Sequence, residues 1–131
     1  MKDSRSVRWL GRDTVRAPYL TLCLSSAEFR RVARQLKVED PGTWKTESQV
    51  ACVHTWENAG RLCCIVCIDP AEDVDPIDMA CMFVHEAVHV FQRLCDSIGE
   101  SQPSREFEAY SIERISEQLM REYVRRMTGK R

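Results

Sequence analysis

Two of the three histidines in this 131-residue chain stand four positions apart, in the segment His85-Glu86-Ala87-Val88-His89. This spacing constrains the fold, because two such imidazoles reach one metal ion when the backbone is helical and places them on the same face. The flanking residues from 80 to 92 include no proline or glycine and are otherwise almost all uncharged. Since a helix that is apolar nearly all round is a buried one, the sequence predicts a buried helix around the two histidines.

A catalytic zinc ion takes three protein ligands and keeps one position for water, so a third ligand is needed. The segment 103–127 is expected to be a helix, and its acidic residues include Glu106, Glu108, Glu113 and Glu117. The positions four, seven, eleven and fifteen residues after Glu108 are Ile112, Ile115, Leu119 and Tyr123. Glu108 thus shares the apolar stripe of this helix, whereas Glu106 lies about 200° away around the axis. The helical phase favours Glu108 as the third ligand, with Glu106 as the alternative. Glu108 could instead lie at the edge of the apolar stripe, partly exposed, or pair with an arginine.

His85, Glu86 and His89, followed by Glu108-Ala109-Tyr110, resemble the active-site core of gluzincins, the thermolysin-like branch of the HExxH metallopeptidases. The resemblance covers about residues 79–119 and is nearest in appearance to small intracellular and phage-encoded peptidases with Glu-Ala-Asn or Glu-Ala-Tyr after the motif. It implies that His85, His89 and Glu108 bind Zn²⁺ and that Glu86 is the general base. Ile112 stands where thermolysin has an aspartate that orients a histidine, so this support must come from elsewhere.

These roles imply zinc-dependent peptide hydrolysis, in which Glu86 activates a metal-bound water that attacks a peptide carbonyl. The oxyanion that develops needs a second donor, for which Tyr110 and His54 are the candidates; His54 reads equally as one residue of a half-buried strand. We expect an extended peptide to add as a further strand beside residues 61–68 or their partner strand. Two other classes stay open: a non-catalytic protein stabilised by zinc, and a metal-free adaptor.

The composition narrows the choice of partners. The net charge is −1, which gives no field that attracts nucleic acid, and no apolar run is long enough to span a membrane. Seven cysteines in mostly apolar segments are typical of free thiols in a reducing compartment. We therefore expect a cytoplasmic protein whose partners are a peptide or protein substrate and a regulatory or scaffold protein. The basic residues within 1–18 are expected to form a flexible arm.

Cys64-Ile65-Val66-Cys67 has a spacing found in metal sites. It lies inside the apolar run from 62 to 68, which is typical of a strand, and residues three apart in a strand point to opposite faces. No second pair of this kind exists in the chain. We therefore expect no second metal site here.

The remaining patterns supply the scaffold. A strand at 19–24 is followed by a capping box, Ser25 to Glu28, that opens a helix to about residue 38. Residues 49–56 and 61–68, joined by Asn58-Ala59-Gly60, are expected to form a β-hairpin. Loops at 69–78 and 97–104 precede the motif helix and the last helix. The prediction is a single α+β domain, residues 1–131, of minimal zincin-like form: a small antiparallel sheet packed on the active-site helix, followed by a second long helix.

Overall fold

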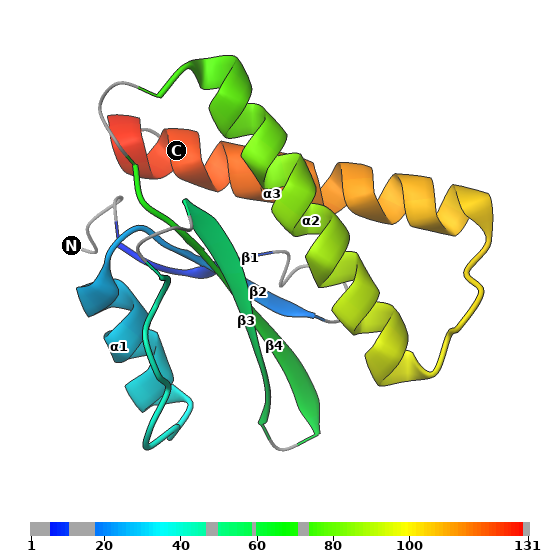
Figure 1. The fold of residues 1–131 in the computed structure, drawn as a ribbon, viewed down its shortest axis with the longest axis horizontal. Helices are drawn as coiled ribbons and strands as arrows, with labels where there is room; N and C mark the ends of the chain where they lie inside the picture. Colours follow the sequence, from blue (N-terminus) through cyan, green and yellow to red (C-terminus); the bar gives the residue numbers. More distant parts are fainter. Residues whose placement is uncertain (1–5, 11–17, 47–49, 59, 71–73, 130–131) are drawn as a thin grey trace.

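The computed structural model describes residues 6–10, 18–46, 50–58, 60–70 and 74–129. They form an α+β fold with a mixed four-stranded sheet and three helices (Figure 1). In chain order the elements are β1 (Trp9–Leu10), β2 (Tyr19–Cys23), α1 (Ser26–Gln35), β3 (Ala51–Asn58), β4 (Arg61–Ile68), α2 (Pro76–Ile98) and α3 (Arg105–Thr128).

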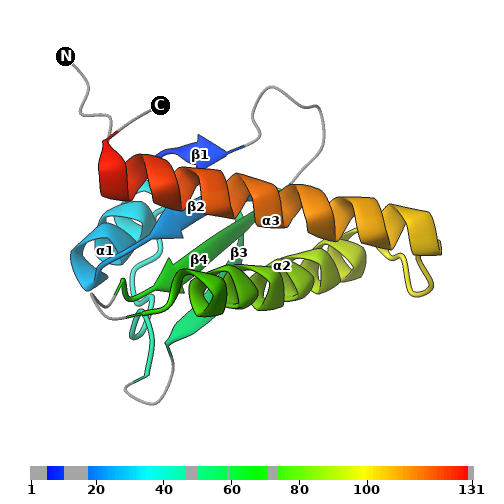
Figure 2. The same cartoon turned by 90° about the horizontal axis from the view of Figure 1, so that it is seen from above.

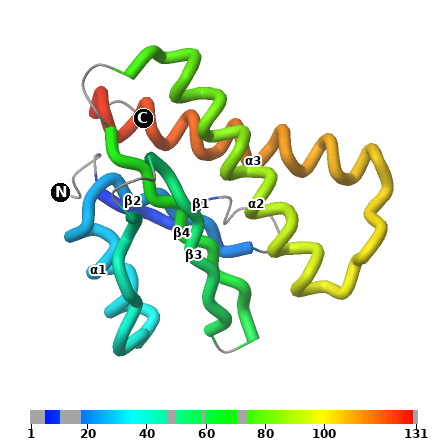
Figure 3. Tube along the Cα trace, in the orientation of Figure 1, coloured from blue at the N-terminus to red at the C-terminus, as the bar shows by residue number. Residues whose placement is uncertain are grey.

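The sheet has the strand order β1-β2-β4-β3 (Figure 3). β1 pairs with β2 and β3 pairs with β4 in antiparallel fashion, but β2 and β4 run parallel. The prediction of an antiparallel sheet is therefore wrong at this one junction. The physical reason is the path of the chain after β2. α1 and the segment that follows it return the chain to the end of the sheet where β2 stops, β3 runs back along the edge, and β4 then runs beside β2 in the same direction.

The hairpin of β3 and β4 is confirmed, with β3 from Ala51 to Asn58 instead of the predicted 49–56. Its register pairs Asn58 with Arg61 and Cys52 with Cys67. Because β4 lies between β2 and β3, it is the central strand of the three. β3 has a strand neighbour on one side only among the described residues, so its outer edge is free of strand pairing.

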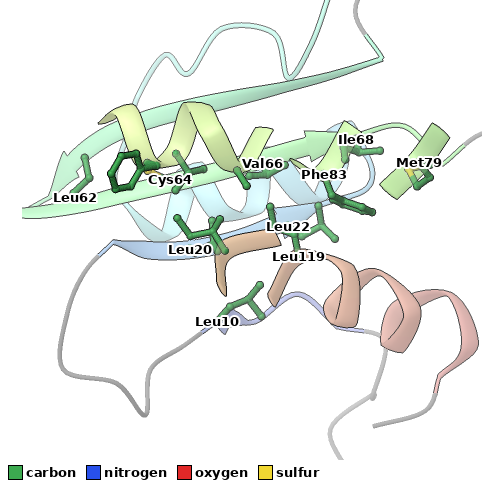
Figure 4. Close-up of a cluster of buried hydrophobic side chains, with 14 of the residues drawn as sticks. Leu10, Leu20, Leu22, Leu62, Cys64, Val66, Ile68, Met79, Phe83 and Leu119 are labelled. Atoms are coloured by element: carbon green, nitrogen blue, oxygen red, sulfur yellow. The ribbon is translucent and has the colours of Figure 1, made fainter. Parts of the chain in front are cut away.

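Helices cover both faces of the sheet, with α1 on one side and α2 with α3 on the other (Figure 2). Alternate residues of β4 divide between the two sides. Cys64, Val66 and Ile68 share one hydrophobic cluster with Phe83 of α2 and Leu119 of α3 (Figure 4). Ile65 and Cys67 face Phe29 of α1. The prediction that Cys64 and Cys67 point to opposite faces is thereby confirmed.

Local sequence signals explain where the helices begin and end. The Ser25 hydroxyl accepts a hydrogen bond from the Glu28 amide, and the Glu28 carboxylate accepts one from the amide of Leu24, so the predicted capping box forms. Asp75 caps α2 ahead of a proline in the first turn, and Gly99 ends it with a φ of 73°. Ser104 caps α3 by accepting a hydrogen bond from the Phe107 amide.

The N-terminal segment was predicted as a flexible arm, and its residues 1–5 and 11–17 lie outside the described part. The described residues 6–10 correct this prediction, because they include β1, and Arg8 forms an ion pair with Glu122 of α3 at 3.1 Å. Basic residues within a segment therefore did not mean that all of it was solvated. None of the described helices combines the length and apolar character needed to cross a membrane.

An ionic cluster anchors the C-terminal half of α3. Glu122 is fully buried and accepts two hydrogen bonds of 2.8 Å from the guanidinium of Arg125. Arg126 is 4.0 Å from the same carboxylate, forms an ion pair with Glu28 of α1 and donates to the carbonyl of Leu22 in β2. The cluster thus ties α3 to both α1 and the sheet.

Candidate functional site

Helix α2 is buried along one side only. Its buried residues include Phe83, Glu86, Ala87, Val90 and Phe91, whereas His85 and His89 are exposed. The prediction of a helix buried all round is therefore wrong. Its physical reason is that the sheet and α3 cover one side of α2, while apolar residues such as Val84, which is 42% exposed, lie on the uncovered side.

The two histidines of the motif lie together on this exposed side. Their Nε2 atoms are 3.2 Å apart. In a tetrahedral zinc site with bonds of about 2.0–2.1 Å, two nitrogen ligands lie about 3.4 Å from each other. The pair therefore fits one zinc ion with little adjustment, and both nitrogens are accessible from solvent.

A third side chain orients one of these ligands. Nδ1 of His89 is 3.0 Å from Oε1 of Gln92, which follows three residues later on the same helix. The amide oxygen can only accept, so Nδ1 of His89 carries the proton and its Nε2 keeps a lone pair for a metal. Gln92 thus supplies for His89 the kind of support that Ile112 cannot give. Sequence reasoning missed Gln92, although the three-residue spacing on a helix was a usable signal.

Glu86 has a different environment from the histidines that flank it. Glu86 lies on the side of α2 that packs against the core, and 5% of the residue is exposed. Burial raises the pKa of the Glu86 carboxyl, and the charges of His85 and His89 partly oppose this rise. A carboxylate whose pKa is raised toward neutrality is better suited to accept and return a proton.

The structure does not bring Glu108 together with the two histidines. Among the described residues, the group of three metal-binding side chains that it assembles does not include His85, His89 or Glu108. Glu108 continues the stripe of Ile115 and Leu119 on α3, as its helical phase predicts, but it is exposed because this end of α3 extends past the core. Glu106 is exposed as well.

The start of α3 nevertheless lies beside the motif. The ring of Phe107 packs on that of Phe91 in α2, with centroids 5.5 Å apart. The residue before Glu108 therefore contacts the helical turn that follows His89.

The two candidate oxyanion donors lie in different places. Tyr110 is 67% exposed on α3. His54 belongs to β3, where its ring packs on Phe29 of α1 with centroids 4.5 Å apart. The sheet thus separates the His54 ring from α2, and the structure does not bring His54 together with the histidines of the motif.

His54 instead joins a second group, which we call the sulfur–histidine cluster: Cys52, His54 and Cys67. Their ligand atoms all lie within 4.8 Å of one another, so the cluster could hold a metal ion. Nε2 of His54 is 3.6 Å from Sγ of Cys52 and 2.8 Å from the carbonyl oxygen of Trp44. The spacing of Cys64 and Cys67 did not predict this cluster, because Cys67 finds its neighbours across the hairpin and not at Cys64.

Hydrogen bonding within this cluster changes its acid–base properties. A hydrogen bond from Cys67 lowers the pKa of the Cys52 thiol to about 5, with His54 contributing in the same direction. The hydrogen bond with Cys52 raises the pKa of His54. Cys64, on the opposite face of β4, has its pKa raised to about 12 by burial.

A shallow cleft of about 540 Å³ runs between β3 and the C-terminal half of α2. Thr55 and Glu57 line it from the strand, and Arg93, Asp96 and Ser97 line it from the helix. Arg93 follows His89 by four residues, one turn along the same helix. The cleft therefore begins one helical turn beyond His89 and is bordered by the edge strand of the sheet; the residues of the motif do not line it.

Comparisons with protein-family models, with curated proteins and with solved structures give no match to this chain. The gluzincin resemblance therefore stays a prediction that rests on the residues of α2 and α3.

Proposed function

We propose that this protein is a zinc-dependent peptidase whose metal is held by His85 and His89 and whose general base is Glu86. The observation that carries the proposal is the 3.2 Å separation of the two Nε2 atoms, which suits tetrahedral coordination of one ion. The contact of His89 with Gln92 supports the proposal as well, because it favours the tautomer of His89 that leaves Nε2 free for the metal. Exposure of both histidines leaves room for water and substrate.

Glu108 is the third ligand in this proposal. It shares the helical stripe of Ile115 and Leu119, and it is exposed near the end of α3 that packs against α2. No ion pair of Glu108 is found within the described ranges, which argues against the alternative that an arginine holds it. Glu106 is the competing third ligand, and the variants Glu108→Gln and Glu106→Gln distinguish between the two.

The chemistry divides between the metal and the chain. Bound zinc would polarise the carbonyl of the scissile bond and lower the pKa of a coordinated water. Glu86 accepts a proton from the attacking water and passes it to the amine that leaves. Burial of Glu86 favours its protonated form, so the carboxyl retains the proton between these two steps.

The substrate class follows from the cleft that begins one helical turn beyond His89. β3 has a free edge, and its backbone donors and acceptors can pair with a peptide in extended conformation. Arg93 and Asp96 lie along the cleft, so both signs of charge face the peptide. An unfolded segment or loop that can form a strand is therefore the favoured substrate, and a compact surface is not.

The decisive experiment combines zinc content with cleavage of a peptide library. We expect wild type to cleave in a chelator-sensitive way, and His85→Ala and His89→Ala each to lose one zinc per chain and all turnover. Glu86→Gln should keep its zinc and lose turnover. Glu108→Gln should lose zinc and Glu106→Gln should keep it. If Glu106→Gln loses zinc instead, Glu106 and not Glu108 is the third ligand. Undiminished cleavage by Glu86→Gln would rule out the mechanism.

A zinc-stabilised protein without peptidase activity is the second candidate. The observation that favours it is the separation of Glu108 from the two histidines, since an ion with two protein ligands is not a complete catalytic centre. In that case, removal of zinc should lower the melting temperature while no peptide in the library is cleaved by the zinc-bound protein.

A further inference from the structure

The sulfur–histidine cluster is assembled by three neighbouring strands on the face that α1 covers. Cys52 and His54 are two residues apart on β3, so both point to the same side. Cys67 of β4 is the register partner of Cys52, and Cys23 of β2 is the register partner of Cys67 on the other side. Three thiols therefore lie in a row across the sheet, with an imidazole beside the outermost one.

The separations within this row match those of a metal site. Zinc bonds of about 2.3 Å to sulfur and about 2.0–2.1 Å to nitrogen place sulfur and nitrogen about 3.6 Å apart around a tetrahedral ion. Sγ of Cys52 and Nε2 of His54 are 3.6 Å apart. The thiol of Cys67 interacts with those of both Cys52 and Cys23. The donor atoms of Cys52, His54 and Cys67 all lie within 4.8 Å of one another and face one point, while the thiol of Cys23 neighbours that of Cys67 only.

We propose that Cys52, His54 and Cys67 bind a zinc ion at a second, structural site, separate from the histidine pair on α2. Two thiolates and one imidazole are donors that zinc prefers. Cys67 is fully buried, and α1 covers this face of the sheet, which fits a structural role. The site joins β4 to β3, and so it stabilises the edge strand of the sheet.

The carbonyl of Trp44 makes metal binding at the cluster depend on pH. This carbonyl oxygen lies 2.9 Å from Sγ of Cys52 and 2.8 Å from Nε2 of His54. Both groups can donate to it when they carry protons. Zinc binding would release these protons, so the contacts with Trp44 would be lost and affinity should fall at low pH. Lys45, next in the chain, lies near enough to lower the pKa of Cys52, and it would offset the negative charge of two thiolates on one ion.

Simple packing of small apolar thiols is the competing explanation, since buried free cysteines are common. It accounts for Cys63 and Cys64, whose side chains lie among apolar residues. It does not explain why an imidazole points its Nε2 at a cysteine sulfur inside the same row.

Cobalt titration separates this site from the one on α2. Co²⁺ bound by thiolates gives a sulfur-to-metal charge-transfer band in the near ultraviolet, which a site of histidines and a carboxylate lacks. We expect the metal-free, reduced His85→Ala/His89→Ala protein to bind one equivalent of Co²⁺ with this band, and Zn²⁺ to remove the band. The result does not depend on peptidase activity, so failure of either proposal leaves the other testable.

The variants are chosen so that misfolding cannot imitate the result. Cys52→Ser changes a half-buried residue by one atom and should abolish the band, while circular dichroism stays that of wild type. Cys64→Ser is the matched control, because this thiol lies on β4 but faces the other side of the sheet; it should keep the band. Cys67→Ser should weaken Co²⁺ binding at least tenfold. Absence of the band in folded, reduced protein, or its persistence in Cys52→Ser, would overturn the proposal.

Discussion

Replacing Glu122 by glutamine tests how the second long helix is held in place. The carboxylate is 1% exposed and lies against the guanidinium groups of Arg125 and Arg126, whose side chains are 6% and 3% exposed. Glutamine preserves the shape and one acceptor oxygen but removes the negative charge. The two buried cations then lose the partner that balances them.

The expected cost follows from this burial. Breaking a buried ion pair by removal of one partner costs about 3–5 kcal/mol, because the remaining charge is left uncompensated. We take the lower value, about 3 kcal/mol, since Glu28 still pairs with Arg126. An unfolding entropy of about 2.1 cal/mol/K per residue over 131 residues converts this into a melting temperature about 11 °C lower. The contact with Arg8 adds little, because that side chain is 55% exposed.

Thermal melts followed by circular dichroism measure this change. Glu117→Gln is the matched control on the same helix, since its pair with Arg121 is 3.7 Å long with side chains 61% and 78% exposed. It should shift the melting temperature by about 2 °C or less. Glu122→Leu combined with Arg125→Met should be more stable than Glu122→Leu alone. A Glu122→Gln protein that melts within about 2 °C of wild type would refute the reasoning.

Three further predictions concern the two candidate sites. In metal-free protein, Glu86→Gln should raise the melting temperature at pH 7, because the raised pKa of Glu86 means that stability falls as pH rises through that pKa; melts well below pH 4.5 should show no difference. Gln92→Ala should weaken zinc binding by about 10- to 100-fold without unfolding the protein, as measured by competition with a chelator. At pH 6, iodoacetamide should label Cys52 in metal-free protein and not Cys64, by peptide mass spectrometry, since their pKa values are about 5 and about 12; saturating zinc should protect Cys52.

Much of the fold follows from local patterns. The capping box at Ser25 and the hairpin are each specified by a few neighbouring residues, and they form as predicted. The parallel pairing of β2 with β4 could not be predicted in this way. It depends on the placement of β4 between β2 and β3, a long-range pairing that no local pattern specifies.

The exposure of the motif helix was misread for a related reason. Val84 and Val88 made the segment look apolar on every side, yet Val84 is exposed and Val88 only half-buried. What decides the exposed side of α2 is the position of α3, which crosses it with Phe107 on Phe91 and Tyr123 on Phe83. Periodicity along one helix does not contain that information.

The sulfur–histidine cluster was only partly hidden in the sequence. A hairpin in which Asn58 pairs with Arg61 necessarily pairs Cys52 with Cys67, so all three residues of the cluster follow from the turn. Cys23 neighbours Cys67 through the parallel register of β2 on β4. Spacing rules for cysteines within one strand miss such a cluster, because its donors lie across strands.

The two proposed zinc sites differ in their exposure to solvent, which distinguishes a catalytic metal site from a structural one. The histidine pair on α2 is exposed and lies one helical turn from a cleft, whereas the cluster on β3 and β4 is closed in by α1 and by the carbonyl of Trp44. They lie on opposite sides of one sheet and share no side chain, so their losses should add. Wild type should then hold two zinc ions per chain, His89→Ala and Cys52→Ser one each, and the double variant none. Of the single variants, only Cys52→Ser should lower the melting temperature strongly, because its ion joins two strands of the sheet whereas the other joins surface groups.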